Sequence, residues 1–170
     1  MILIQQDQFF QDIEQARAWA LSVPLYTQSD YNQRFDKDER WPGLRSQLLS
    51  EAHPGLNLMI HQHIWRIPQM NTARFHCVVH FRGEGSQDWI HQDDEPLAGV
   101  CYINPTNLDS GTRMYTDEGE VHVDLKYVQN RLILYSGSYP HQGYGHWGIH
   151  PAEGRTTINL FWDMDQSNNR

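Results

Sequence analysis

The sequence of 170 residues has only two cysteines, Cys77 and Cys101. It therefore lacks the several regularly spaced cysteines that are typical of a small disulfide-bonded domain. Each cysteine lies inside an alternating apolar segment, so we expect two buried free thiols. No apolar run approaches the roughly 20 residues that a membrane-spanning helix needs. The N-terminus also lacks the basic flank and long apolar stretch of a signal peptide. These absences predict a soluble, cytoplasmic protein without a membrane partner.

Basic residues are scarce as well, because 13 Lys and Arg stand against 21 Asp and Glu and give a net charge of −8. A chain with this balance has no general attraction to polyanions, so we expect no nucleic acid partner and favour a small-molecule or peptide substrate. Linker-like stretches rich in Ser, Gly or Pro are also missing. With 39% hydrophobic residues, the composition predicts one globular domain over residues 1–170.

Helical periodicity dominates the first third of the chain, where Asp7 is a candidate N-cap and apolar residues recur at about 3.6-residue spacing. We expect residues 1–70 to supply helical support for the rest. The expected segments are a helix from about Gln8 to Leu21, a polar loop over Ser29 to Glu39, a short helix over Leu44 to Leu49 and a helix that starts at Pro54.

The hydrophobic period changes to two after Thr72, which predicts strands. The first alternates around Phe75 and Phe81, ends at Gly83 and reads as half-buried, with His76 and His80 facing solvent or satisfied in the interior. Further strands are expected at Asp88 to His91, Leu97 to Asn104, Thr112 to Thr116, Val121 to Leu125, Arg131 to Ser136, His141 to Tyr144 and Arg155 to Trp162. Helices followed by about eight short strands predict a mainly β double-stranded β-helix, or jelly roll, whose core spans 71–165.

The sharpest local signal is the tripeptide His91-Gln92-Asp93. On a strand, residues two apart face the same side, so the imidazole and the carboxylate can reach one ion. The pair alone is weak, since a surface histidine beside an acidic turn is common. His141 follows fifty residues later, and a jelly roll brings such distant strands together. Two histidines and one carboxylate leave coordination positions open and favour non-haem iron(II) chemistry over a closed zinc site.

Arg155 opens the last expected strand, fourteen residues after His141. Thr157, Asn159 and Phe161 share its face of that strand. An arginine fork beside a hydroxyl binds a carboxylate specifically, whereas an isolated arginine at a strand start is an ordinary surface residue.

Together these motifs resemble the 2-oxoglutarate/iron(II)-dependent dioxygenases, in particular the prolyl-4-hydroxylase-like branch. The shared segments, in the family's order, are His91-x-Asp93, the strand Ala98 to Asn104, the turn Ser110-Gly111-Thr112, the strand Asn130 to Tyr135, Pro140-His141 and Arg155. The resemblance implies that His91, Asp93 and His141 hold iron(II). It also implies that 2-oxoglutarate and dioxygen are co-substrates, with Arg155 on the distal 2-oxoglutarate carboxylate and Tyr102 and Thr157 as further donors.

Two positions depart from the family pattern: Phe81 stands where many relatives have a tyrosine, and Ser110-Gly111-Thr112 replaces a commoner Gly-Gly pair. Because Asp93 is present, the resemblance implies hydroxylation, or a related oxidation, of an amino acid, peptide or small organic substrate, with release of succinate and CO2. The alternative is a cupin-like metal- or ligand-binding jelly roll without oxygenase activity. The segment over 28–40 is either a lid or a surface loop.

Overall fold

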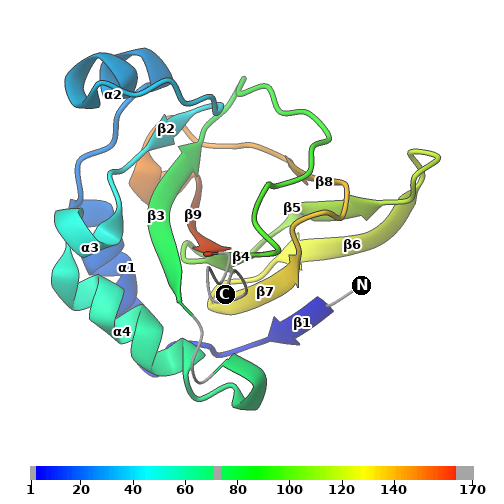
Figure 1. Cartoon of the computed structure of the whole chain (residues 1–170), viewed down its shortest axis with the longest axis horizontal. Coiled ribbons are helices and arrows are strands. Elements are labelled where there is room, and N and C mark those ends of the chain that lie inside the picture. Colours follow the sequence, from blue (N-terminus) through cyan, green and yellow to red (C-terminus); the bar gives the residue numbers. More distant parts are fainter. Residues whose placement is uncertain (1–2, 71–73, 164–170) are drawn as a thin grey trace, which may run out of the picture.

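The computed structural model describes residues 3–70 and 74–163. Its helices are α1 (Ile13–Ser22), α2 (Gln28–Phe35), α3 (Leu49–Ala52) and α4 (Pro54–Ile64), with short 3₁₀ turns η1 (Pro68–Met70) and η2 (Pro151–Glu153). The strands are β1 (Leu3–Gln6), β2 (Leu44–Arg45), β3 (Phe75–Arg82), β4 (Leu97–Tyr102), β5 (Asn107–Tyr115), β6 (Val121–Tyr127), β7 (Arg131–Ser136), β8 (His141–Tyr144) and β9 (Arg155–Trp162) (Figure 1). None of the helices within these described ranges is long and apolar enough to cross a membrane.

Two antiparallel sheets form the body of the molecule. The larger has the strand order β1-β7-β4-β9-β3-β2, and the smaller has the order β6-β5-β8. Strands far apart in sequence are neighbours in the larger sheet, since β3 pairs with β9 along eight residues and β4 lies between β7 and β9. This arrangement confirms the expected jelly roll with N-terminal helices.

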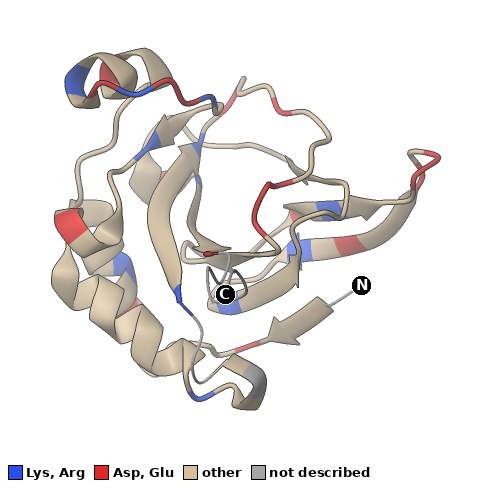
Figure 2. Cartoon of the chain, viewed as in Figure 1, with Lys and Arg blue, Asp and Glu red and all other residues tan. Residues whose placement is uncertain are grey.

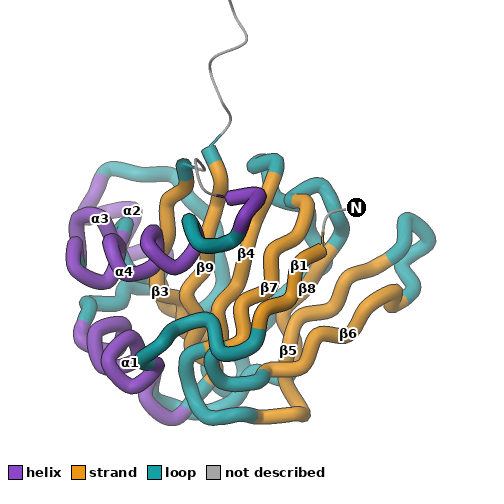
Figure 3. The backbone as a smooth tube through the Cα atoms, turned by 90° about the horizontal axis from the view of Figure 1, so that it is seen from below, coloured by secondary structure: helices purple, strands orange, loops and turns teal. Residues whose placement is uncertain are grey.

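Helices α1, α3 and α4 pack on the outer face of the larger sheet, as the view in Figure 3 shows. Ala16 and Ala20 of α1 and Ile60 of α4 join the same buried cluster as Cys77 and Val79 of β3. Burying a large aliphatic side chain contributes about 1.5–3 kcal/mol, so this layer holds the sheet against the helices. A second cluster fills part of the space between the sheets: Ala98, Val100, Tyr102, Met114, Leu125, Tyr127, Ile133 and Tyr135.

Strand β3 is therefore buried on both faces, and the prediction of a half-buried strand was wrong. Its apolar face packs on the helices, whereas the face that carries His80 and Arg82 lies between the two sheets. His80 is buried and satisfied, one of the two outcomes expected for it: its Nε2 lies 2.6 Å from the carbonyl oxygen of Pro42. This bond ties the turn after residue 40 to the inner face of the sheet.

The first helix begins at Ile13 and not near Gln8, because the preceding backbone is held elsewhere. The side chain of Asn130 accepts a hydrogen bond from the Phe10 amide at 2.8 Å and donates to the Phe10 carbonyl at 2.9 Å. Asn130 itself lies in the left-handed region with φ of 62°, a conformation that asparagine tolerates in turns. The segment that precedes α1 is thus fixed to the β6–β7 turn, and the helix begins only after it.

Asp7 does not cap that helix. Its carboxylate accepts hydrogen bonds from Arg131 at 2.6 and 2.9 Å, and Asp12 caps the helix by accepting from the backbone amide three residues later. Residues 3–6 were not predicted as a strand, yet β1 pairs with β7 at the edge of the larger sheet. The first 70 residues therefore give strands as well as helical support.

The expected polar loop over 29–39 contains α2 instead. Thr27 caps it by accepting a hydrogen bond from the Asp30 amide at 3.1 Å, and Tyr31 anchors it with ring contacts to Phe35 and Trp41. Capping and burial of one aromatic therefore outweigh the low hydrophobicity of the segment.

The prediction of a short helix over 44–49 was also wrong. Leu44 and Arg45 form β2, paired with Phe81 and His80 of β3, and α3 follows. No strand forms over Asp88 to His91, where the described chain makes only an isolated bridge between His91 and His141. The predicted bounds of β7, β8 and β9 are confirmed, and both cysteines are buried and free.

Candidate metal centre and adjoining cavity

A cavity of about 550 Å³ lies between the two sheets. The larger sheet contributes His80, Arg82, Arg155, Asn159 and Phe161 to its wall, the smaller sheet contributes Thr112, His141 and Gly143, and the loops contribute Trp41, Trp89, His91 and Asp93. All three residues of the predicted metal triad therefore face one cavity, together with the predicted carboxylate-binding arginine.

The triad converges closely. One ligand atom each from His91, Asp93 and His141 can be chosen so that all lie within 4.8 Å of one another. The His91 Nε2 lies 3.7 Å from one Asp93 oxygen, and the His141 Nε2 lies 3.3 Å from the other. The structure thus brings together three side chains that are separated by up to fifty residues in sequence.

Backbone carbonyls orient both imidazoles. The Nδ1 of His91 lies 3.0 Å from the Trp89 carbonyl, and the Nδ1 of His141 lies 2.8 Å from the Tyr139 carbonyl. Since a carbonyl only accepts, each Nδ1 carries the hydrogen, and in the neutral ring each Nε2 keeps a free lone pair. This fixed tautomer is the usual arrangement of metal-binding histidines.

Burial lowers the pKa of His91, and the neighbouring His141 lowers it further. The neutral, metal-binding form of His91 is therefore favoured at neutral pH.

The backbone holds the loop that carries Asp93 against β8. His91 and His141 exchange two backbone hydrogen bonds of 3.0 and 2.9 Å, and the Asp93 amide donates to the Gly137 carbonyl at 2.8 Å. A Cβ on Gly137 would lie 1.9 Å from the Glu95 carbonyl oxygen, so only glycine allows this close approach. The position of the carboxylate thus follows from main-chain pairing and not from a strand.

One oxygen of Asp93 is placed to bind a cation. Within the described part of the chain, the buried Asp93 Oδ2 has no hydrogen-bond donor, although the lone pair of His141 Nε2 faces it. Two acceptors in such contact are unfavourable unless a cation or a proton lies between them. Two imidazoles and one carboxylate, with a cavity beyond them, fit an iron(II) ion with open coordination positions.

Arg155 is buried, at 3% exposure, and lines the same cavity as the triad. Its Nη2 donates to the Gly111 carbonyl at 2.9 Å, but its Nε has no acceptor among the described residues. Burial lowers the pKa of the guanidinium. A buried cation with an unused donor at a cavity wall is suited to bind an anion.

Sequence reasoning missed a second buried arginine. Arg82 lies opposite Arg155 in the β3–β9 register, and its guanidinium forms an ion pair with Asp88, whose side chain is only 2% exposed. Gly143 fits between them, because a Cβ there would lie 2.9 Å from Arg82 Nη1 and 3.0 Å from Arg155 Nη2. The polar residues on the inner face of β3 were the available signal.

Asp88 also organises the loop before the triad. Its carboxylate accepts a hydrogen bond from the Trp89 amide at 2.8 Å, and its carbonyl accepts from the Gln142 side chain at 3.2 Å. His146 Nε2 approaches the carboxylate to 3.8 Å, and burial together with Arg155 and Arg82 lowers the pKa of His146 to about 3. The loop is thus tied to both sheets.

Tyr102 and Thr157 lie deeper than the cavity wall. Burial raises the pKa of Tyr102 to about 12, and its hydroxyl donates to Thr112 Oγ1 at 2.8 Å. Thr157 donates to the Asn159 side chain at 2.7 Å. In each case the residue that lines the cavity is the partner, Thr112 or Asn159.

By sequence, no protein-family model and no curated protein matches the chain. By structure, it is similar to a prolyl-4-hydroxylase of Pseudomonas putida, with a TM-score of 0.57, 18% identity and coverage of 94% of this chain and 91% of that one. It is also similar to the non-haem alpha-ketoglutarate-dependent carbocyclase SnoK from nogalamycin biosynthesis, with a TM-score of 0.59, 9% identity and coverage of 94% and 78%. A third similar structure, IDO from Bacillus thuringiensis, has a TM-score of 0.56, 13% identity and coverage of 96% and 91%. The chain therefore has the fold of the 2-oxoglutarate/iron(II) oxygenases.

Proposed function

We propose that the protein is an iron(II)- and 2-oxoglutarate-dependent dioxygenase that hydroxylates, or otherwise oxidises, an amino acid, peptide or small organic substrate. The observation that carries the proposal is the convergence of three ligand atoms within 4.8 Å at the wall of a cavity that also contains buried Arg155. Co-substrate decarboxylation would release succinate and CO2. A net charge of −8 favours such substrates over nucleic acid.

Each residue of the site has a proposed part in binding. His91 and His141 would hold iron(II) through Nε2, while the carbonyls of Trp89 and Tyr139 fix their rings. Asp93 would supply the anionic ligand. When bound, iron(II) with 2-oxoglutarate and dioxygen supplies the oxidising chemistry that no side chain can provide.

Arg155 would pair with the distal carboxylate of 2-oxoglutarate, because its unused Nε faces the interior. We propose that Tyr102 and Thr157 support the co-substrate through the wall: Tyr102 holds the Thr112 hydroxyl and Thr157 holds the Asn159 amide. Arg155 is buried, so solvent screens its charge little.

A cupin-like binding protein without oxygenase activity is the second candidate, because the triad alone serves either role. Buried Arg155 favours the oxygenase, since a metal-binding module has no need of a carboxylate-binding cation beside the metal.

The test is anaerobic addition of iron(II) and 2-oxoglutarate, followed by visible spectroscopy of the weak charge-transfer band of their chelate. We expect the band with the wild-type protein and its loss in Asp93→Ala and His141→Ala. His150→Ala, which removes an exposed histidine outside the triad, is the matched control and should keep the band. Absence of the band in the wild type, or its persistence without Asp93, would refute the proposed metal centre.

Arg155→Ala separates the oxygenase from the binding protein. We expect 2-oxoglutarate affinity to fall by about 2–4 kcal/mol while iron(II) affinity changes little, because a buried charge pair is lost. Calorimetric titration of each ligand measures both. Unchanged 2-oxoglutarate affinity would remove Arg155 from its proposed role and favour the second candidate.

A further inference from the structure

Three arginines of the larger sheet, Arg45, Arg82 and Arg155, line the cavity. Two of them have a buried partner or a proposed ligand: Arg82 pairs with Asp88, and Arg155 faces the expected 2-oxoglutarate. Arg45 has neither. Its guanidinium donates no hydrogen bond to any residue in the described part of the chain, and its nearest carboxylate, that of Glu39, lies 3.9 Å away.

Two aromatic rings hold Arg45 in place. The guanidinium carbon lies 5.0 Å from the centre of the Trp41 ring and 5.3 Å from that of the Phe161 ring, and the side chain is 18% exposed. Ring contacts of this kind cover the faces of a guanidinium and leave its N–H edges available. A pre-oriented fork with five unused donors is suited to a planar anion that accepts two parallel hydrogen bonds, which is a carboxylate.

Glu39 does not fill this role. Its side chain is 43% exposed, and at 3.9 Å the pair is too long for a hydrogen bond. A carboxylate that enters the cavity can therefore displace Glu39 toward solvent at little cost, because exposed ion pairs contribute little stability.

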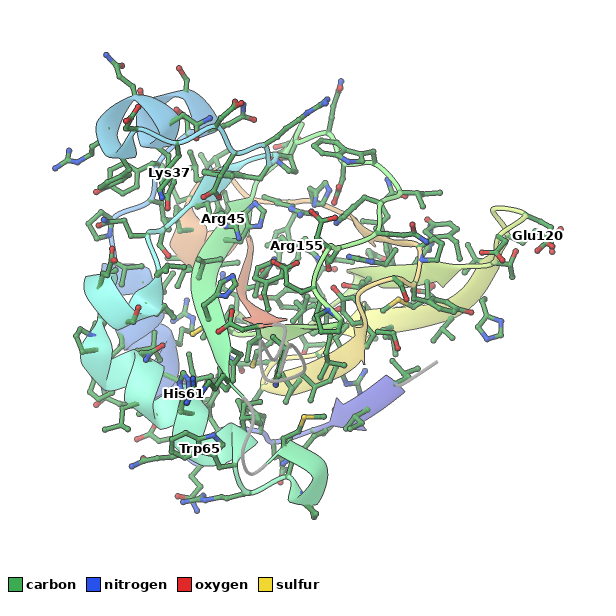
Figure 4. The ribbon with its side chains drawn as sticks, viewed as in Figure 1. Lys37, Arg45, His61, Trp65, Glu120 and Arg155 are labelled. Carbon is green, nitrogen blue, oxygen red and sulfur yellow. The ribbon has the colours of Figure 1, made fainter. Side chains whose placement is uncertain are left out.

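The Arg45 position is separate from that of Arg155. Across the sheet, Arg45 pairs with His80, and His80 pairs with Thr157 on the strand that carries Arg155. Two strand spacings separate β2 from β9, which is about 10 Å. Figure 4 labels both arginines on the side of the sheet that faces the interior, Arg45 nearer the outer edge. One carboxylate of 2-oxoglutarate cannot occupy both positions.

Space for the rest of a ligand adjoins Arg45. A second cavity, also of about 550 Å³, meets the first at Arg45, Glu39 and His76, and Tyr31 and Phe35 contribute aromatic rings to its wall. A group bound to Arg45 therefore lies at the junction of the two cavities, with aromatic surface on both sides.

From these contacts we propose that Arg45 binds a carboxylate of the primary substrate, so that the substrates are small organic acids, amino acids included. This inference rests on the proposed oxygenase function, because only an enzyme has a substrate. The binding of a carboxylate at Arg45 does not depend on iron or on turnover, so it can be tested alone.

The probe is a panel of L-amino acids and of short- and medium-chain carboxylic acids, each compared with its primary amide. Binding to the protein is measured without added metal by ligand-observed NMR and calorimetry. We expect at least one acid to bind where its amide does not, and Arg45→Gln to weaken that acid by about 30-fold or more. Arg45→Lys should give an intermediate loss, because it keeps the charge without the planar fork.

Two further variants locate the site. Arg155→Gln should still bind the acid, which excludes binding at the proposed 2-oxoglutarate position. Arg34→Gln is the matched control, since Arg34 also lies over aromatic rings, those of Tyr26 and Phe35, but lines neither cavity. It should leave the acid's affinity unchanged, and thermal unfolding checks that every variant is folded.

Several results would overturn the inference: no acid in the panel binds, acids and amides bind equally, or Arg155→Gln and not Arg45→Gln abolishes binding. These failures differ from failure of the proposed function. A protein that forms the iron(II)–2-oxoglutarate band but binds no acid through Arg45 contradicts only the substrate class. A protein that binds acids through Arg45 without forming the band contradicts only the oxygenase.

Discussion

Replacing Asp88 by asparagine tests whether the buried ion pair with Arg82 holds the site together. The two side chains are 2% and 10% exposed, so solvent screens their charges little. Burial and the neighbouring Arg155 lower the pKa of the Arg82 guanidinium. The Asp88 carboxylate is the anion that pairs with this guanidinium. Without Asp88, two buried guanidiniums face each other across one strand pair.

Removing one partner of a buried ion pair destabilises a protein by about 3–5 kcal/mol, because the remaining charge is left uncompensated. For a chain of this size, that corresponds to a decrease in Tm of about 6–20 °C. Urea unfolding followed by circular dichroism measures the first quantity, and scanning calorimetry measures the second. The double variant Arg82→Met with Asp88→Leu should recover most of the loss, since it removes both charges.

Asp124→Asn is the control, because Asp124 also accepts hydrogen bonds, from Lys126 and Tyr144, but its side chain is 31% exposed. It should change the free energy of unfolding much less than Asp88→Asn does. Two results would contradict this reasoning: a decrease of less than about 1 kcal/mol in Asp88→Asn, or a double variant that is no more stable than the single one. Either would show that the buried Arg82 charge does not depend on Asp88 for compensation.

Three other predictions follow from the site. Gly143→Ala should weaken 2-oxoglutarate by about tenfold in calorimetry and spare the metal, because its Cβ would crowd the guanidiniums of Arg82 and Arg155; equal affinity would show that both move freely. Because the pKa of His146 is about 3 in the folded protein, His146 binds a proton below pH 6.5 in the unfolded state but not in the folded state. The free energy of unfolding should therefore decrease as the pH is lowered from 6.5 toward 3, and it should depend less on pH in His146→Gln, as urea unfolding at each pH measures. If iron(II) binds at the proposed triad, its chelation should lower the Tm of the wild type but not of Asp93→Ala, and an equal decrease in both would place the metal elsewhere.

Of the three strands whose bounds sequence reasoning gave correctly, β8 is an edge strand of the smaller sheet, and the other two lie between neighbours on both sides. Residues 131–136 and 155–162 lie inside the larger sheet, where long apolar or alternating runs are required, so their pattern marks their ends. The segments 3–6 and 44–45 are edge strands of four and two residues. Strands this short do not contain enough residues to show an alternating hydrophobic pattern. Whether they form is decided by the strands with which they pair.

The helix errors have a similar origin. The sequence pointed to Asp7 as the cap, but the bonds between Asn130 and the Phe10 backbone, 120 residues apart, keep the segment before Asp12 out of the helix. In α2, burial of Tyr31 against Trp41 supplies what the polar composition lacks. Each decision depends on a contact that local propensity does not contain.

The convergence of His91, Asp93 and His141 on one cavity could be predicted, because the first two lie two residues apart on one short segment and the third follows an apolar strand. Arg45 and Arg82 were missed because their importance depends on which face of the sheet looks into the cavity. The acidic residues Asp93, Asp94 and Glu95 are evident in the sequence, and Figure 2 shows acidic positions along the loop between β3 and β4. Only the fold shows that this loop lines the cavity. Side-chain parity on β3, with His80 and Arg82 opposite Val79, was the usable signal.

The two walls of the cavity differ in charge, and this difference orders what binds there. The larger sheet presents the guanidiniums of Arg45 and Arg155, while the smaller sheet and its adjoining loop present His141 and the carboxylate of Asp93. A divalent cation is stable only at the second wall, and anions are stable only at the first. Under the proposed function, a dicarboxylate that would join the metal to Arg155 leaves Arg45 as the cation of that wall without a buried anion, and the proposed acidic substrate would supply that anion.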